Sequence, residues 1–306
     1  MNLNELRYIV AVAREKHFGH AAESCFVSHP TLRVAVELLE EELGVTLFER
    51  SKTEVTITPI GATVVERAQR ILEEVEGLRS AAAGQRDQLQ GSLRMGVIYT
   101  IGPYLLPPLL PEIHDSAPDM PLIIAEDYTA NLRQRLKQGE LDAIIISLPF
   151  EEPGIVTLPL YEEPFDALLP SSHPLTHRKQ LRLEELADEH LLLLGPGHCF
   201  RDQVLESYPF NQHPAQKNEF SHSVAGTSLE TLRQMVATGL GVTVLPSTAA
   251  GADRYAGRLL AIRRLVSPTP TRTVALAWRA TYPRPKAIEA LRQAIHRCSL
   301  SGVQPV

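Results

Sequence analysis

Apolar residues recur every three to four positions through the first 45 residues, which predicts three short helices. Ser28 stands where an N-cap belongs, with Pro30 in the first turn of the third helix. A tight turn near Phe26 and Val27 makes the last two helices a helix-turn-helix, and alternation over residues 53–58 predicts a β-wing. The repeating positions are Leu3, Leu6, Ile9, Val10 and Ala13, then Ala21, Ala22 and Cys25, then Leu32, Val36, Leu39 and Leu43.

A narrower apolar stripe follows this small domain, which we assign to residues 1–58. A second helix start is expected at Thr58 and Pro59, and the apolar spacing then alternates between four and three, as in a heptad seam. Charged residues cover the other faces, so the stripe suits a partner helix better than a globular core. We predict a dimerising linker helix over residues 59–88, with a helix packed on its own domain as the alternative. The seam residues are Val64, Ala68, Ile71, Val75, Leu78 and Ala82.

The pattern changes after the polar, glycine-flanked stretch 84–91, which marks a domain boundary. Short apolar runs now alternate with helical patterns at 131–138 and 229–238, as in open sheets flanked by helices. We therefore predict an α/β domain over residues 89–306. The expected strands lie at 93–98, 122–125, 143–147, 167–169, 191–194, 242–245 and 274–278.

Composition narrows the class of protein. A chain of 306 residues with 44% apolar and 22% charged residues can bury a real core, which excludes disordered and fibrous proteins. It holds no run of 18 apolar residues, and the start MNLNELRYIV is too polar for a secretory signal, so we expect a cytoplasmic protein without a membrane span. The three cysteines are widely separated, which argues against a disulfide framework or a zinc finger.

No metal site is expected either. The histidine pairs His17 with His20 and His173 with His177 have no supporting cluster of ligands. We interpret them as solvated histidines of loops or helix surfaces.

The chain resembles the LysR-type transcriptional regulators over its whole length. The resemblance is carried by LRYIVAVAREKHFGHAAESCFVSHPTLRVAVELLEEELGVTLFER, by TPIG at the start of the heptad helix, and by the α/β region that follows. It implies a winged helix-turn-helix, a linker coiled coil and a periplasmic-binding-protein-like effector domain without a cofactor. Subdomain I would span about 92–163 plus 268–306, and subdomain II about 164–267. The implied partners are double-stranded promoter DNA, RNA polymerase and further copies of the chain, in a homotetramer built as a dimer of dimers.

Two segments are similar to the peroxide-sensing members of this family. They read GHCFRDQVLE at 197–206 and SLETLRQMVATGLGVTVLP at 228–246. The similarity implies that Cys199 senses hydrogen peroxide or thiol oxidation, that Thr100 and Thr129 hold the peroxide against its sulfur, and that the controlled genes are antioxidant genes.

The residues around Cys199 suit this chemistry. A thiol reduces peroxide as its thiolate, so a sensing cysteine needs nearby groups that stabilise negative charge. His198 and Arg201 bring potential positive charge, and a helix starting near Phe200 would put the sulfur at its positive end. Asp202 and Gln203 are expected to orient these groups. Cys25 is interpreted as core filler and Cys298 as inert.

One position departs from the family pattern. The peroxide sensors carry a second, resolving cysteine nine residues after the first, where this chain has Tyr208. The usual internal disulfide therefore cannot form. The sequence leaves open a sulfenic acid or a mixed disulfide with a small thiol, a bond between subunits, an engineered replacement, and loss of sensing with the fold retained.

The DNA-reading residues are expected in the first turn of the third helix and at the wing. Residues 1–58 hold six Lys and Arg against nine carboxylates, which is unusual for a DNA reader. We therefore expect weak, strongly salt-dependent binding by each monomer, raised by avidity in the tetramer. The candidate contacts are His29, Pro30, Thr31, Arg33, Arg50 and Lys52.

Two other functions compete with peroxide sensing. One is a regulator of the same family that binds a small organic anion between its subdomains, with Cys199 merely structural. The other, ranked far lower, is an enzyme, a thiol peroxidase that turns over at Cys199. The sequence favours a transcriptional regulator that is not an enzyme.

Overall fold

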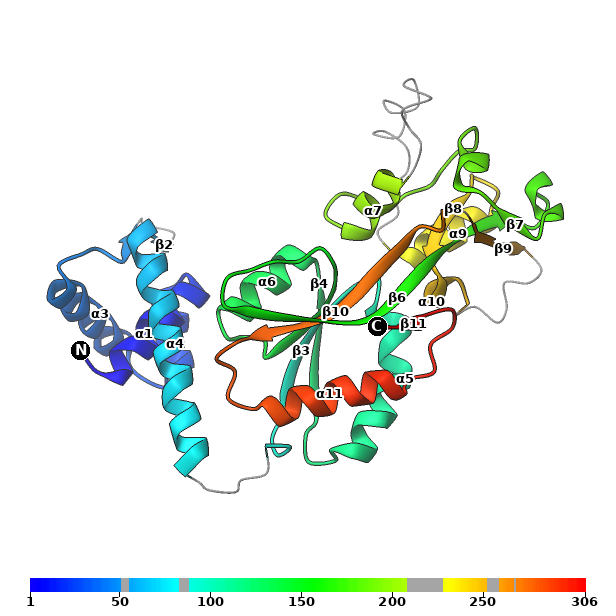
Figure 1. Cartoon of the computed structure of the whole chain (residues 1–306). Coiled ribbons are helices and arrows are strands. Elements are labelled where there is room, and N and C mark those ends of the chain that lie inside the picture. The colour runs from blue at the N-terminus through cyan, green and yellow to red at the C-terminus, as the bar shows by residue number, and fades with distance from the viewer. Residues whose placement is uncertain (51–54, 83–87, 208–227, 252–258, 267) are drawn as a thin grey trace. The chain divides into compact units, whose positions relative to one another are not determined.

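A computed structural model describes residues 1–50, 55–82, 88–207, 228–251, 259–266 and 268–306 (Figure 1). Lys52 and Tyr208 lie outside the described residues. The chain divides into two compact units. The first contains residues 1–88 with 134–142 and 279–285, and the second contains 89–133, 143–278 and 286–306.

The N-terminal helices begin where capping residues stand. The side chain of Asn2 caps α1, and the Ser28 hydroxyl accepts a hydrogen bond from the Thr31 amide at the start of α3. Apolar faces of these helices form one core, to which the wing adds Leu47 and Phe48. The elements are α1 (Leu3–Glu15), α2 (Phe18–Ser24), α3 (His29–Leu43), the antiparallel wing strands β1 (Phe48–Arg50) and β2 (Val55–Ile57), and α4 (Pro59–Ala82).

Helix α4 turns only part of the predicted dimerisation seam outward. Ala68 is only 2% exposed and belongs to the core with α1, and Val64 packs against that core. These two positions therefore stabilise their own domain, because the helix turns the first half of the stripe inward. Ile71 and Leu78 remain exposed, and Val75 is half-buried. The side chain of Ala82 lies outside the described part of the chain.

The second unit, called the effector unit below, is built on one mixed sheet. Within the described residues nine strands join, in the order β4-β3-β5-β10-β6-β9-β7, with β8 and β11 also paired to β6. The long strands β6 and β10 run side by side from one end of the sheet to the other (Figure 1). The strands are β3 (Leu93–Ile98), β4 (Leu122–Asp127), β5 (Ala143–Ser147), β6 (Ile155–Pro170), β7 (Gln180–Leu181), β8 (Thr243–Pro246), β9 (Leu260–Leu265), β10 (Thr271–Arg279) and β11 (Gln304–Pro305).

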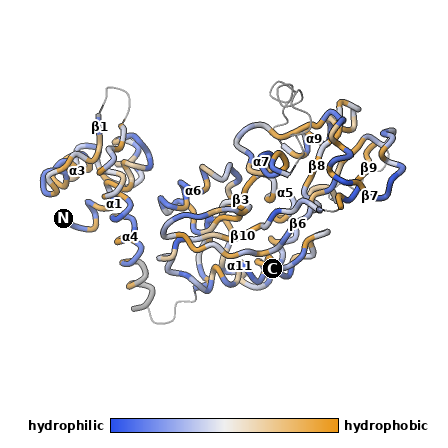
Figure 2. Tube along the Cα trace, turned by 45° about the horizontal axis from the view of Figure 1, so that its top comes forward, coloured by the Kyte–Doolittle hydropathy of each residue, from blue (hydrophilic) through white to orange (hydrophobic). Residues whose placement is uncertain are grey.

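Helices cover this sheet with their apolar faces. Hydrophobic colour gathers along β3 and β10 in Figure 2, and it alternates with hydrophilic colour along the amphipathic α11. The expected strand at 191–194 is reduced to a bridge between Leu191 and Val242. The helices are α5 (Gly102–Ser116), α6 (Thr129–Lys137), α7 (Cys199–Ser207), α9 (Leu229–Ala237), α10 (Ser247–Ala250) and α11 (Pro285–Arg297), with 3-10 turns η1 (Pro174–His177) and η2 (Leu183–Leu186). No helix among the described residues is both long and apolar enough to cross a membrane.

A fully buried ion pair joins the two long strands. The Arg272 guanidinium of β10 donates to Glu163 of β6, at 2.8 Å from Nε and 2.7 Å from Nη2, and both side chains are 0% exposed. Glu163 also accepts hydrogen bonds from the amide and hydroxyl of Thr248. Arg272 donates onward to the hydroxyl and carbonyl oxygens of Thr100, at 2.9 and 3.0 Å. The ion pair therefore holds Thr100 in place just after the end of β3.

We predict that Glu163→Gln lowers the free energy of unfolding of the effector unit by about 3 kcal/mol, because it leaves the Arg272 charge buried without its counter-ion. The exposed pair Arg292–Glu289 provides the control, and Glu289→Gln should cost less than about 1 kcal/mol. Urea unfolding followed by the fluorescence of Trp278, the single tryptophan, measures both. Equal effects of the two substitutions would contradict the prediction.

Candidate functional site

A small hollow lies at the edge of the sheet where two parallel strands end. Strand β3 ends at Ile98 and its neighbour β4 at Asp127, so the residues that follow them, Thr100 and Thr129, reach the same edge. Helix α7 begins at Cys199 beside them. The hollow measures about 10 Å³ and is lined by Ile98, Tyr99, Thr100, Asp127, Tyr128, Thr129, Gly197, His198 and Cys199.

The hydroxyl of Thr100 is oriented by the buried ion pair. Its oxygen accepts from Arg272 Nη1 at 2.9 Å, and Thr100 is only 2% exposed. A hydroxyl that accepts one hydrogen bond still has its own hydrogen to donate. Thr100 can therefore donate to a small acceptor in the hollow.

The hydroxyl of Thr129 has no hydrogen-bond partner within the described chain, although its oxygen is buried. Asp127 holds the start of α6 in place, because its Oδ1 accepts from the Tyr128 amide at 2.8 Å and from Asn131 Nδ2 at 2.7 Å. A buried polar atom without a partner is costly in a folded protein. The Thr129 hydroxyl can therefore hydrogen-bond a small polar molecule in the hollow.

Aromatic rings close the hollow around Cys199. The ring of His198, which is buried, lies 4.8 Å from that of Tyr128 and 6.1 Å from that of Tyr99, measured between centroids. Gly197 has a φ of +94°, and a Cβ there would lie 3.4 Å from the Tyr128 ring. The chain thus turns into α7 through a position that favours glycine. The sulfur sits at the helix end that favours negative charge.

Three other residues expected at this site do not line the hollow. Arg201 donates to the carbonyl oxygen of Leu194 at 2.7 Å. Gln203 Nε2 donates to the Ser147 hydroxyl and the Leu148 carbonyl, both at 2.9 Å, and Asp202 is exposed. They anchor α7 or face solvent. Of the expected pocket, the structure brings together Thr100, Thr129, His198 and Cys199. Nothing in the sequence indicated that this site would also include Tyr99, Tyr128 and Arg272.

The second group of expected site residues lies on the outer face of α3. His29, Pro30, Thr31 and Arg33 are all exposed there. Arg33 Nε donates to Glu37 Oε1 at 3.0 Å, one turn later. The side chain of Arg50 and all of Lys52 lie outside the described part of the chain.

Exposed apolar side chains that were not expected among the DNA-reading residues share this region. Val34 is 52% exposed and Leu38 is 55% exposed, at successive turns of α3. Phe26, in the turn before the helix, is 96% exposed with a φ of 56°. The sequence could have indicated the exposure of Val34 and Leu38, because they do not occupy the inward-facing positions of the helical pattern.

Two of the four histidines expected to be solvated, His17 and His173, cap helices. His17 Nδ1 accepts from the amides of Gly19 and His20 at the start of α2. His173 Nδ1 accepts from the Leu175 amide at the start of η1, and its Nε2 lies 3.1 Å from Glu189. No metal-binding group of three or more such ligands occurs in the part of the chain that the structure describes.

All three cysteines are free. Cys25 follows α2 and packs against the N-terminal core. Cys298 follows α11 and donates from its sulfur to the Ala294 carbonyl at 3.2 Å. Burial, together with the nearby Glu112 carboxylate, raises the pKa of Cys298 to about 11.

Comparisons with known proteins agree over the whole chain. Residues 3–62 match the bacterial regulatory helix-turn-helix protein model of the lysR family, and residues 86–298 match the LysR substrate binding domain. The chain is 39% identical over 302 residues, 99% of its length and 97% of the relative's, to the DNA-binding transcriptional dual regulator OxyR of Escherichia coli. It is 38% identical over 295 residues, 96% of its length and 95% of the relative's, to the hydrogen peroxide-inducible genes activator of Dickeya chrysanthemi.

Solved structures give the same picture. Full-length Pseudomonas aeruginosa OxyR, as a cysteine variant, superposes with a TM-score of 0.88 at 51% identity, covering 99% of this chain and 98% of that one. A hydrogen-peroxide-bound variant of Corynebacterium glutamicum OxyR superposes with a TM-score of 0.65 at 34% identity, covering 97% and 92% of the two chains.

We predict that Cys298 reacts slowly with iodoacetamide at neutral pH. Since only the thiolate is alkylated and the pKa of this thiol is raised to about 11, its rate should keep rising toward pH 11. Mass spectrometry of peptides from a Cys199→Ser variant measures that rate. A plateau near pH 9, as for an ordinary thiol, would refute the prediction.

Proposed function

The chain belongs to the LysR family of bacterial regulators, and from this premise we propose that it is a DNA-binding transcriptional regulator that detects hydrogen peroxide through Cys199. The observation that carries the proposal is the orphan hydroxyl of Thr129, which is buried in a hollow that Cys199 also lines. The names of the relatives, OxyR and hydrogen peroxide-inducible genes activator, support the same effector.

The proposed reaction is a displacement at oxygen. The Cys199 thiolate attacks one oxygen of hydrogen peroxide, an S–O bond forms, and the O–O bond breaks. Sulfur loses two electrons and becomes a sulfenic acid, while the other oxygen leaves as hydroxide and takes up a proton to give water. Hydroxyl donors at Thr100 and Thr129 stabilise the charge that develops on the leaving oxygen.

The size of the hollow favours peroxide over an organic anion. A space of about 10 Å³ accommodates roughly one water-sized molecule, and a metabolite with a carbon skeleton needs several times more. The rival proposal, a small organic anion between the subdomains with a structural Cys199, would need a space other than this hollow.

The signal after oxidation differs from that of a two-cysteine sensor. Position 208 carries tyrosine, so the sulfenic acid has no cysteine partner there. We propose that the sulfenic acid, or a mixed disulfide with a small thiol, is the active form. Antioxidant genes are the proposed targets, and the chain is proposed to act on them as a regulator rather than an enzyme.

The DNA-binding part of the proposal rests on α3. Its exposed first turn offers Arg33 to base edges or phosphate, as the recognition helix of a helix-turn-helix does. We propose a cytoplasmic homotetramer, a dimer of dimers, that contacts RNA polymerase and holds promoter DNA. The exposed Ile71 and Leu78 of α4 support a shortened dimerisation seam in its second half.

We predict that Thr129→Val slows the oxidation of Cys199 by at least about tenfold, because one donor to the leaving oxygen is lost. Thr129→Ser keeps the hydroxyl and should react at nearly the original rate. Intact mass after timed exposure to peroxide, with dimedone trapping the sulfenic acid, measures the rate. Equal rates for the valine variant and the unchanged chain would count against the assignment.

The same samples test regulation. Peroxide should change the footprint on a DNA fragment that the chain protects, and Cys199→Ser should show neither the added mass nor the changed footprint. A footprint that responds to an organic acid and survives Cys199→Ser would favour the rival effector.

We predict opposite effects on DNA binding when Arg33 and Glu37 of α3 are replaced. Arg33→Ala should weaken binding to DNA selected by the protein from random sequence by about tenfold, through a lost base or phosphate contact. Glu37→Gln should strengthen it, because a carboxylate beside the DNA is removed. Fluorescence anisotropy across a range of KCl concentrations measures both. Arg292→Ala, on α11 of the effector unit, is the control, and an equal loss there would refute a specific role for Arg33.

A further inference from the structure

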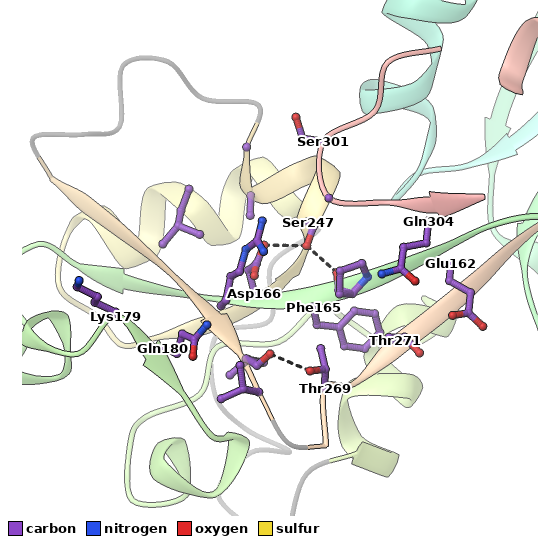
Figure 3. A pocket seen from close by; sticks show the side chains of 18 residues that line it. Glu162, Phe165, Asp166, Lys179, Gln180, Ser247, Thr269, Thr271, Ser301 and Gln304 are labelled. Atoms are coloured by element: carbon purple, nitrogen blue, oxygen red, sulfur yellow. Dashed lines mark hydrogen bonds between the residues drawn. The ribbon is translucent and has the colours of Figure 1, made fainter. Parts of the chain in front are cut away.

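A larger hollow in the effector unit is balanced in charge. It measures about 720 Å³, shares no lining residue with the hollow at Cys199, and lies beside β6, β9 and α10 (Figure 3). The carboxyl groups of Glu162 and Asp166 line it together with the cations Lys179 and Arg264. Because opposite charges stand on its walls, the lining selects neither an anion nor a cation. The exposed face of α3 has a more selective chemistry.

The outer face of α3 carries an apolar ridge formed by Pro30, Val34 and Leu38. These residues are spaced four apart, so each follows the previous one along the same side of the helix. All three are exposed, and Val34 and Leu38 each expose more than half of their surface. The buried residues of α3 lie on the opposite side and pack in the N-terminal core. The ridge is therefore not part of that core.

The polar residues beside the ridge make contacts within the chain. The Thr31 hydroxyl is hydrogen-bonded inside the N-cap of the helix, at 2.7 Å. Arg33 Nε donates to Glu37 Oε1, and the ring of His29 meets the edge of the Phe18 ring at 6.4 Å between centroids. These contacts occupy part of the polar capacity of the first two turns. The ridge, by contrast, is exposed as it stands.

The width of the ridge suits the edge of a base better than the surface of a protein. It is one side chain wide, and charged residues that include Arg33 and Glu37 border it. A stable protein interface buries about 800 Å² per partner, far more than three side chains supply. The major groove of DNA admits an α-helix, and the apolar group that its base edges present there is the C5-methyl group of thymine.

The charge of the N-terminal segment also favours contacts with bases. Residues 1–58 hold nine carboxylates against six Lys and Arg, so their attraction to phosphate is weak. Glu37, one turn after Arg33, places a further negative charge on the exposed face of α3. Contacts with base edges must therefore supply a larger share of the affinity than in a strongly basic DNA reader.

We propose that Val34 reads the C5-methyl group of a thymine in the major groove, with Pro30 and Leu38 extending the apolar contact on either side. The inference rests on the DNA binding proposed above and specifies what α3 recognises. Val34 is the central residue because a recognition helix contacts base edges from its N-terminal turns, and Val34 lies in the second turn of α3. The contact is apolar and needs no change in the ion pair of Arg33.

Deoxyuridine tests this proposal, because it pairs with adenine as thymine does and lacks only the C5-methyl group. The probe is a duplex that the full chain selects from random sequence, in which each thymine of the protected region is replaced in turn. We expect an affinity loss of about fourfold at one or more positions, the effect of one buried group of methyl size. Fluorescence anisotropy measures the Kd of each duplex.

Variants of Val34 locate the contact. Val34→Ala should bind the thymine duplex about fourfold more weakly, and it should bind the thymine and deoxyuridine duplexes nearly equally. Val34→Thr keeps one methyl group on the same Cβ and should retain part of the difference. The control is Val156→Ala, which truncates another exposed valine, in β6 of the effector unit. It should leave the difference between thymine and deoxyuridine unchanged.

Three results would overturn the inference and leave the proposed DNA binding intact. Deoxyuridine binds as well as thymine at every position, Val34→Ala keeps the full difference, or the selected duplexes share no thymine. Selection of no duplex at all would instead remove the DNA binding, and the inference with it. Sedimentation distinguishes the other occupant: if Val34→Ala makes the assembly smaller and keeps the full difference, the ridge contacts a second copy of the chain and the inference is wrong.

Discussion

The buried pair between Arg272 and Glu163 is the interaction on which the effector unit depends. A guanidinium without access to water is tolerated only when its charge and its donors are met. Here the carboxylate of β6 balances the charge, and the two oxygens of Thr100 accept two further hydrogen bonds from the guanidinium. The arrangement therefore ties the two long strands together and presents a threonine hydroxyl at the end of β3. Packing alone would not hold that hydroxyl in one orientation.

Much of the fold could be predicted from the pattern of apolar residues. The central strands β3 and β5 are nearly or wholly apolar runs, because both faces of the sheet are covered, and their expected bounds agree with the structure. Helix α5 was missed, since it holds Pro107, Pro108 and Pro111, residues that normally end a helix. Strand β9 was missed as well, because Arg263 and Arg264 interrupt its apolar pattern. The apolar run at 191–194 is buried without forming a regular strand, and periodicity alone cannot distinguish the two.

Only part of the candidate site could be predicted from the sequence. The cysteine motif is a short continuous segment, so the family resemblance identified Cys199, and the same resemblance identified Thr100 and Thr129. Arg272 follows Thr100 by 172 positions, and only the pairing of distant strands brings the two together. In the N-terminal unit the heptad spacing was read correctly as a helix, yet spacing does not say which neighbour covers the stripe. Ala68 lies against its own domain because α1 is already adjacent in space.

Strand β6 has a mechanical consequence for any change of shape. It is 16 residues long, or about 50 Å at the usual rise, and it is bonded to β8, β9, β10 and β11. Sliding one half of the effector unit past the other would break that ladder in register, at the cost of many hydrogen bonds at once. Torsion about the strand leaves the ladder intact. Because β6 is shared by both ends of the sheet, we expect a change at one end to reach the other mainly as twist of this strand.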